Sequence, residues 1–87
     1  MKLIPIGFGS YVSAERIVAA VEPESNPIKR VVSQSKDAGK LIDATYGRKT
    51  KTVLIMDSGH VILCPLEPEG VSQRVEESAG GDMNAAG

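Results

Sequence analysis

The sequence has few aromatic side chains, one cysteine and one histidine. Only 3% of its 87 residues are aromatic and none is Trp, so its apolar residues are almost all aliphatic. The single cysteine, Cys64, excludes an internal disulfide, which is typical of the reducing cytoplasm. No apolar run approaches the roughly 18 residues that a membrane-spanning helix needs. These absences predict one small cytoplasmic domain with no membrane contact.

Catalytic patterns are also missing. His60 is the only histidine and no Gly-x-Ser-x-Gly elbow occurs, so a catalytic triad is not expected. On one strand, His60 and Cys64 would lie roughly 13 Å apart, too far for one metal ion or for proton transfer within a subunit. We interpret them as a histidine at a strand entry and a small buried thiol. The sequence therefore predicts a protein that is not an enzyme, has no cofactor and takes no small-molecule substrate; catalysis by Cys64 across a subunit interface is the remaining enzymatic alternative.

Two further polar or glycine-rich features have simple structural interpretations. Gly7-Phe8-Gly9 resembles the start of a phosphate-binding loop, but no third glycine follows at position 12 and no Lys-Ser or Lys-Thr pair follows it. We interpret it as a turn in which glycine relieves crowding. Asp43 falls inside an apolar run, and we expect its carboxylate to accept hydrogen bonds near a turn.

Charge is distributed unevenly along the chain. The net charge is −1, yet residues 1–56 hold nine basic against five acidic side chains, whereas residues 57–87 hold one basic against six acidic. The first part is therefore net +4 and the second net −5. A basic surface on an acidic protein is consistent with this pattern.

The first half of the chain predicts two strands and one helix. Residues 2–6 and 16–21 are apolar runs rich in β-branched side chains, although Ser13 to Glu15 could instead cap a helix over 16–21. A helix over 27–38 is indicated by a Ser25 or Asn26 cap, by apolar residues at helical spacing, and by Gly39 at its end.

The second half predicts an antiparallel meander of strands 41–46, 50–56 and 60–64, then a short helix over 68–77 and a disordered tail over 78–87. Continuous apolar runs suggest strands covered on both faces, and one helix covers only one face of a small sheet. We therefore expect the other face to meet a second subunit. The fold class is α+β, with one domain over 1–77 that consists of a small antiparallel sheet, one main helix and a short C-terminal helix.

The turn over residues 47–51, Gly-Arg-Lys-Thr-Lys, carries three cations that no core can accommodate. Such a turn can be a solvated loop tip or an anion-binding surface. Because only Phe8, Tyr11 and Tyr46 could stack on bases, double-stranded DNA gripped through its phosphates is favoured over single strands. The alternative is a ring-forming interaction scaffold that binds an acidic protein partner.

The chain resembles the RemA family of small extracellular-matrix regulatory proteins over residues 1 to about 75. The resemblance is carried by these motifs: Ile6-Gly7-Phe8-Gly9, Val12-Ser13-Ala14, Arg16-Ile17, Pro23-Glu24-Ser25, Pro27-Ile28-Lys29-Arg30, Leu41-Ile42-Asp43-Ala44-Thr45-Tyr46-Gly47-Arg48, Met56-Asp57-Ser58 and His60-Val61-Ile62-Leu63.

This resemblance implies a bacterial DNA-binding transcriptional regulator of biofilm matrix genes, whose subunits close into a ring-shaped homo-oligomer that organises or bends promoter DNA. It implies DNA contacts by Arg16, Arg48, Lys49 and Lys51. Lys49 and Lys51 stand where the family commonly has arginine, so the charge is kept but the planar two-pronged grip on phosphate is lost. Cys64 stands where serine is common.

Overall fold

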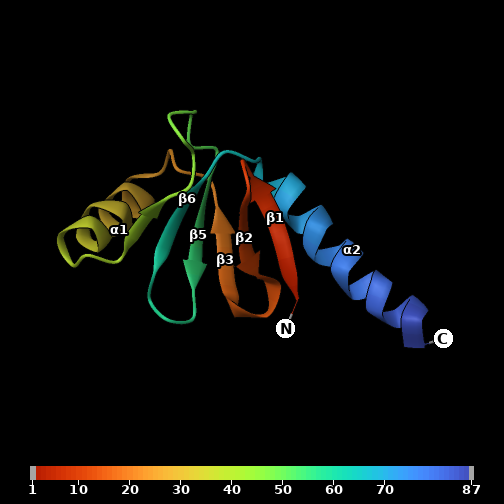
Figure 1. Cartoon of the computed structure of the whole chain (residues 1–87). Helices are drawn as coiled ribbons and strands as arrows, with labels where there is room; N and C mark the ends of the chain where they lie inside the picture. Colours follow the sequence, from red (N-terminus) through yellow and green to blue (C-terminus); the bar gives the residue numbers. More distant parts are fainter. Residues whose placement is uncertain (1, 87) are drawn as a thin grey trace.

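Two α-helices and six strands make up the described part of the chain, which is residues 2–86 of a computed structural model, with side chains described over 2–79 (Figure 1). The elements are β1 (Leu3–Gly7), β2 (Ser10–Ser13), β3 (Ile17–Val21), α1 (Asn26–Asp37), β4 (Leu41–Asp43), β5 (Thr52–Met56), β6 (Val61–Cys64) and α2 (Pro68–Ala86). The predicted α+β class is confirmed. The strand expected over residues 16–21 is confirmed for Ile17–Val21, whereas Arg16 ends a short 3₁₀ turn that begins at Ala14.

The main sheet has the strand order β3-β5-β6-β4. β3 and β6 pair with β5 in antiparallel fashion, whereas β4 pairs with β6 in parallel, so the predicted antiparallel meander is wrong for its first strand. The reason is the path of the connection between β4 and β5. The backbone N–H of Ala44 donates to the carbonyl of Leu63, and that of Lys51 donates to Cys64. The connection therefore crosses the end of β6, so that β4 and β5 pair with opposite edges of β6.

A separate two-stranded sheet is formed by β1 and β2, joined by a tight turn. The sequence did not predict β2. Its buried residue Val12 and the β1 residues Ile4 and Ile6 belong to one core cluster with residues of the main sheet. The hairpin thus packs on the face of the sheet that the sequence left uncovered. Contact of this face with a second subunit stays a prediction.

The rest of this core comes from the sheet and from α2. Leu54 and Ile62 are register partners on β5 and β6, and both belong to one core cluster with Cys64 and with Val71 of α2. Figure 1 shows α2 running beside β1 at the edge of the molecule and extending beyond it. The helix begins at Pro68, as predicted, but its backbone is helical to Ala86, so it is longer than the expected short helix. A helix that has already formed its first turns extends without a new nucleation cost, and this outweighs the weak helix preference of Gly80 and Gly81.

The helical backbone therefore runs through the residues assigned to a disordered tail, of which Gly87 lies outside the described residues. The domain limit at residue 77 stays a prediction. Within residues 2–86, no helix is both long enough and apolar enough to cross a bilayer.

Helix α1 agrees with its prediction. The side chain of Ser25 accepts a hydrogen bond from the backbone N–H of Ile28 at 3.3 Å, which caps the first turn, and Gly39 follows the helix at a φ of +71°. The helix lies on the opposite side of the main sheet from the core cluster, where Val32 lines a groove with Val53 and Leu63. None of its residues is fully buried.

Candidate functional site

The connection over residues 44–51, called the basic loop below, begins at a turn made by Asp43. The Asp43 carboxylate accepts hydrogen bonds from the backbone N–H of Thr45, at 2.9 Å, and from its hydroxyl. The hydroxyl bond first, and then the backbone bond, hold the pKa of the Asp43 carboxyl below its usual value. The predicted role of Asp43 is therefore confirmed, and it ends β4 where the chain leaves the sheet.

A second turn follows at once. The backbone N–H of Arg48 donates to the carbonyl of Thr45 at 3.0 Å, and the two central residues, Tyr46 and Gly47, have φ values of +52° and +82°. Two positive φ values in succession are the signature of a type I′ turn. This turn directs the Tyr46 side chain outward, with 67% of the residue exposed, and sets the direction of the Arg48 side chain that follows.

The hairpin between β1 and β2 uses the same kind of turn. Gly7 pairs with Ser10, and the two residues between them, Phe8 and Gly9, have φ values of +53° and +81°. Gly7 has a φ of +106°, and a Cβ there would lie 3.4 Å from the Pro65 side chain. The glycine pair thus forms a tight turn, as expected, and Phe8 between the two glycines is half exposed.

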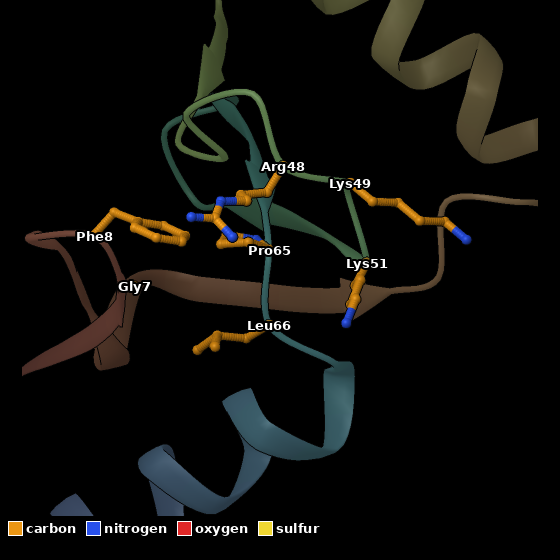
Figure 2. A pocket seen from close by; sticks show the side chains of 7 residues that line it. All are labelled: Gly7, Phe8, Arg48, Lys49, Lys51, Pro65 and Leu66. Atoms are coloured by element: carbon orange, nitrogen blue, oxygen red, sulfur yellow. The ribbon is translucent and has the colours of Figure 1, made fainter.

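The two turns meet at their aromatic residues. The rings of Phe8 and Tyr46 have centroids 6.0 Å apart at an angle of 58°, and the Arg48 guanidinium carbon lies 4.9 Å from the centroid of the Phe8 ring. Both distances are within the range of favourable aromatic and cation–π contacts. Figure 2 shows Arg48 directed toward Phe8.

An open cavity of about 400 Å³ lies beside this contact. It is lined by Gly7, Phe8, Arg48, Lys49, Lys51, Pro65 and Leu66. The Lys51 ammonium lies 3.7 Å from the Glu67 carboxylate, whereas the Lys49 side chain extends away from Phe8 and Arg48 (Figure 2). The three cationic residues Arg48, Lys49 and Lys51 line the cavity together with apolar residues. Such a surface is suited to binding an anion.

Three of the four predicted contact residues are therefore brought together, and the fourth is not. Arg16 precedes β3, and Ile17 pairs with Met56 at the far end of β5 from the basic loop. The Arg16 guanidinium lies 3.6 Å from the Asp57 carboxylate, and the Arg16 carbonyl accepts a hydrogen bond from the Asp57 N–H at 2.9 Å. The five residues of β5, about 17 Å of extended backbone, lie between the Arg16 end of the sheet and the basic loop. All four assignments to DNA remain predictions.

Sequence reasoning missed Phe8 as part of this surface. The available signal was an aromatic residue before glycine at each of two turns, Phe8-Gly9 and Tyr46-Gly47. That signal does not say that two turns far apart in the sequence will touch.

His60 and Cys64 occupy the positions that the sequence predicted. The His60 Nδ1 lies 2.7 Å from the Ser58 hydroxyl at the start of β6, and Cys64 is fully buried. Burial raises the pKa of the Cys64 thiol, against the smaller opposite effects of the Leu66 N–H and the charge of Arg74. Among the described residues, no group of three or more His, Cys, Asp and Glu side chains could hold a metal ion.

Comparisons with known proteins identify relatives over most of the chain. A family model described as extracellular matrix regulatory protein A-like matches residues 3–75. A protein from Cyanothece sp. is 58% identical over 74 residues, covering 85% of this chain and 81% of its own. One from Natranaerobius thermophilus is 57% identical and covers 94% and 92%, and one from Carboxydothermus hydrogenoformans is 54% identical and covers 97% of each. All three carry the provisional name of a regulatory protein.

Proposed function

This chain belongs to the RemA-like family, and on that premise we propose that it is a transcriptional regulator that binds duplex DNA in the cytoplasm. The basic loop and Arg16 contact DNA phosphates, and the target genes are those of a biofilm matrix. The observation that carries the proposal is the exposure of Arg48 and Lys49 on one loop. Within the described residues neither cation forms an ion pair with a carboxylate, so both are available to an external anion.

The separation of Arg16 from the basic loop supports a long ligand. Cationic groups at opposite ends of a strand about 17 Å long cannot grip one phosphate, but they can contact two stretches of a duplex backbone. The aromatic residues support a duplex over a single strand. Base stacking needs a free ring face, and Phe8 already contacts both Arg48 and Tyr46.

We further propose that the subunits associate into a closed ring, which would present these weak contacts to one duplex many times and raise the overall affinity. Exposed apolar side chains support such association. Tyr11 and Ile42 line one groove beside Arg16, and Val18 is exposed on β3, an edge strand of the main sheet. Ile42→Asp should lower the mass of the assembly in native mass spectrometry, whereas Ile28→Asp tests α1 as the alternative contact.

The direct test of the function is retention of partners from a cell lysate. Tagged protein should retain DNA that nuclease treatment releases, and Arg48→Ala should retain much less. Retention of an acidic protein after complete nuclease digestion, again dependent on Arg48, would contradict the DNA proposal and support a protein-binding scaffold. Arg30→Ala, on the exposed side of α1, is the matched control because it removes the same charge from another surface.

A further inference from the structure

We infer that Phe8 is a positioning residue that holds the Arg48 guanidinium in the orientation in which it grips a phosphate. The inference rests on the proposed function, because it assigns a role to a side chain beside the proposed phosphate contact. Its starting point is the contact itself. The Arg48 guanidinium carbon lies 4.9 Å from the centroid of the Phe8 ring, and Tyr46 supports that ring at a centroid distance of 6.0 Å.

The backbone conformation at Phe8 and Tyr46 indicates that the fold itself imposes this contact. Phe8 and Tyr46 both have φ values near +50°, a backbone region that residues other than Gly, Asn and Asp rarely adopt. Each occupies the first central position of a type I′ turn, and each leaves a large apolar ring exposed. Strained backbone of this kind persists where the surrounding structure imposes it, and it concentrates at ligand-binding sites. Here two separate strained turns converge on one arginine.

The chemistry of arginine makes the contact useful. A guanidinium can lie against an aromatic ring through its carbon while its N–H donors, which lie in its plane, remain free for the two oxygens of a phosphate. Within the described residues, the Arg48 side chain donates no hydrogen bond to the protein. The Phe8 ring therefore restricts the arginine without occupying its donors, and the entropy of ordering this side chain is lost on folding instead of on binding.

Lys49 offers a comparison within the same loop. Its side chain lines the same cavity but extends away from Phe8 and makes no aromatic contact that the structure describes (Figure 2). Loss of the Phe8 ring should therefore weaken the contribution of Arg48 and leave that of Lys49 unchanged.

The test is a double-mutant cycle on duplex binding, using Phe8→Leu, Arg48→Ala and the double variant, with Phe8→Tyr as the conservative change. A labelled duplex of about 150 base pairs is titrated at several salt concentrations. Phe8→Leu should weaken duplex binding about two- to fivefold for each Arg48 contact. Phe8→Tyr, which keeps an aromatic ring, should bind as tightly as the unchanged protein. In the Arg48→Ala background, Phe8→Leu should have no further effect. The salt dependence should fall in Arg48→Ala but not in Phe8→Leu, since the charge remains.

Each outcome has one meaning. No binding by the unchanged protein contradicts the proposed function itself. Binding that depends on Arg48 but is as tight in Phe8→Leu as in the unchanged protein overturns only the positioning role. The same holds if Phe8→Leu weakens binding equally with and without Arg48, or if Phe8→Tyr binds as weakly as Phe8→Leu. A measurement without DNA keeps the inference testable if Phe8→Leu is poorly folded. In the unchanged protein and in Phe8→Tyr, the Arg48 side-chain protons should show an upfield ring-current shift by NMR; unshifted Arg48 resonances would overturn it.

Discussion

The guanidinium of Arg16 lies 3.6 Å from the carboxylate of Asp57, at the end of β5 opposite to the basic loop. Both side chains are about half exposed or more, so the pair is screened by water and contributes little to stability, about 0 to 1 kcal/mol. Its larger effect is on the charge that Arg16 offers to a ligand, because Asp57 competes with phosphate for the same guanidinium.

Asp57→Asn should therefore tighten duplex binding about two- to fivefold at low salt and leave thermal stability nearly unchanged. The measurement is a titration of labelled duplex by fluorescence anisotropy, paired with a thermal melt. Glu76→Gln is the matched control, because it changes the net charge equally from an exposed position on α2. Equal tightening by both variants would mean that only net charge matters and that Arg16 is not a contact.

Lys49→Arg should tighten duplex binding about twofold or more. Arginine keeps the charge of lysine and adds a planar pair of donors that fits phosphate. The same titration measures the effect, and Lys36→Arg in α1 makes the same exchange at an exposed position away from the basic loop. Unchanged affinity in Lys49→Arg would contradict a direct phosphate contact by this residue.

Acid should remove the stability that the turn at Asp43 provides. Hydrogen bonds from Thr45 hold the pKa of the Asp43 carboxyl below its ordinary value, so the folded state binds a proton less readily than the unfolded state. The contribution is present above the unfolded pKa of about 3.9 and is lost as the pH falls through the lower folded pKa.

Urea unfolding at about pH 7, about pH 5 and about pH 3 measures this contribution in the unchanged protein and in Asp43→Asn. The difference in unfolding free energy between the two should be constant at the two higher values and smaller at the lowest. A difference that does not change with pH would show that the carboxylate charge is irrelevant to the turn.

The Cys64 thiol should react slowly with thiol reagents in the folded protein. It is fully buried, and burial raises its pKa, so the reactive thiolate is scarce at neutral pH. Labelling by a chromogenic disulfide reagent should be at least about a hundredfold slower than in denaturant. Ser72→Cys in a Cys64→Ser background supplies an exposed cysteine as the control. Comparable rates for the two folded proteins would contradict the burial of Cys64.

Local signals in the sequence predicted much of the fold. The Ser25 cap, the helical spacing and Gly39 fixed α1, and the apolar runs indicated β3, β5 and β6. β2 was missed because Ser10–Ser13 is short and has only two apolar residues. The parallel pairing of β4 was missed because it depends on a connection that crosses the end of β6, and no local pattern records such a crossing.

The candidate site was likewise predictable from the sequence only in part. The cations of the basic loop were evident from the sequence because they are contiguous. The distance of Arg16 from that loop and the convergence of Phe8 on Arg48 depend on register and on contacts between distant turns, which only the folded chain defines.

The salt dependence of duplex binding tests the central claim most directly. The logarithm of the association constant is measured against the logarithm of salt concentration for a duplex of about 150 base pairs, with the unchanged protein, Arg48→Ala and Arg30→Ala. The account predicts tight, salt-steep binding that is weaker and less salt-dependent in Arg48→Ala but unaffected in Arg30→Ala, with native mass spectrometry showing the same assembly in all three. Absence of binding at low salt, or equal slopes in all three proteins, would contradict it.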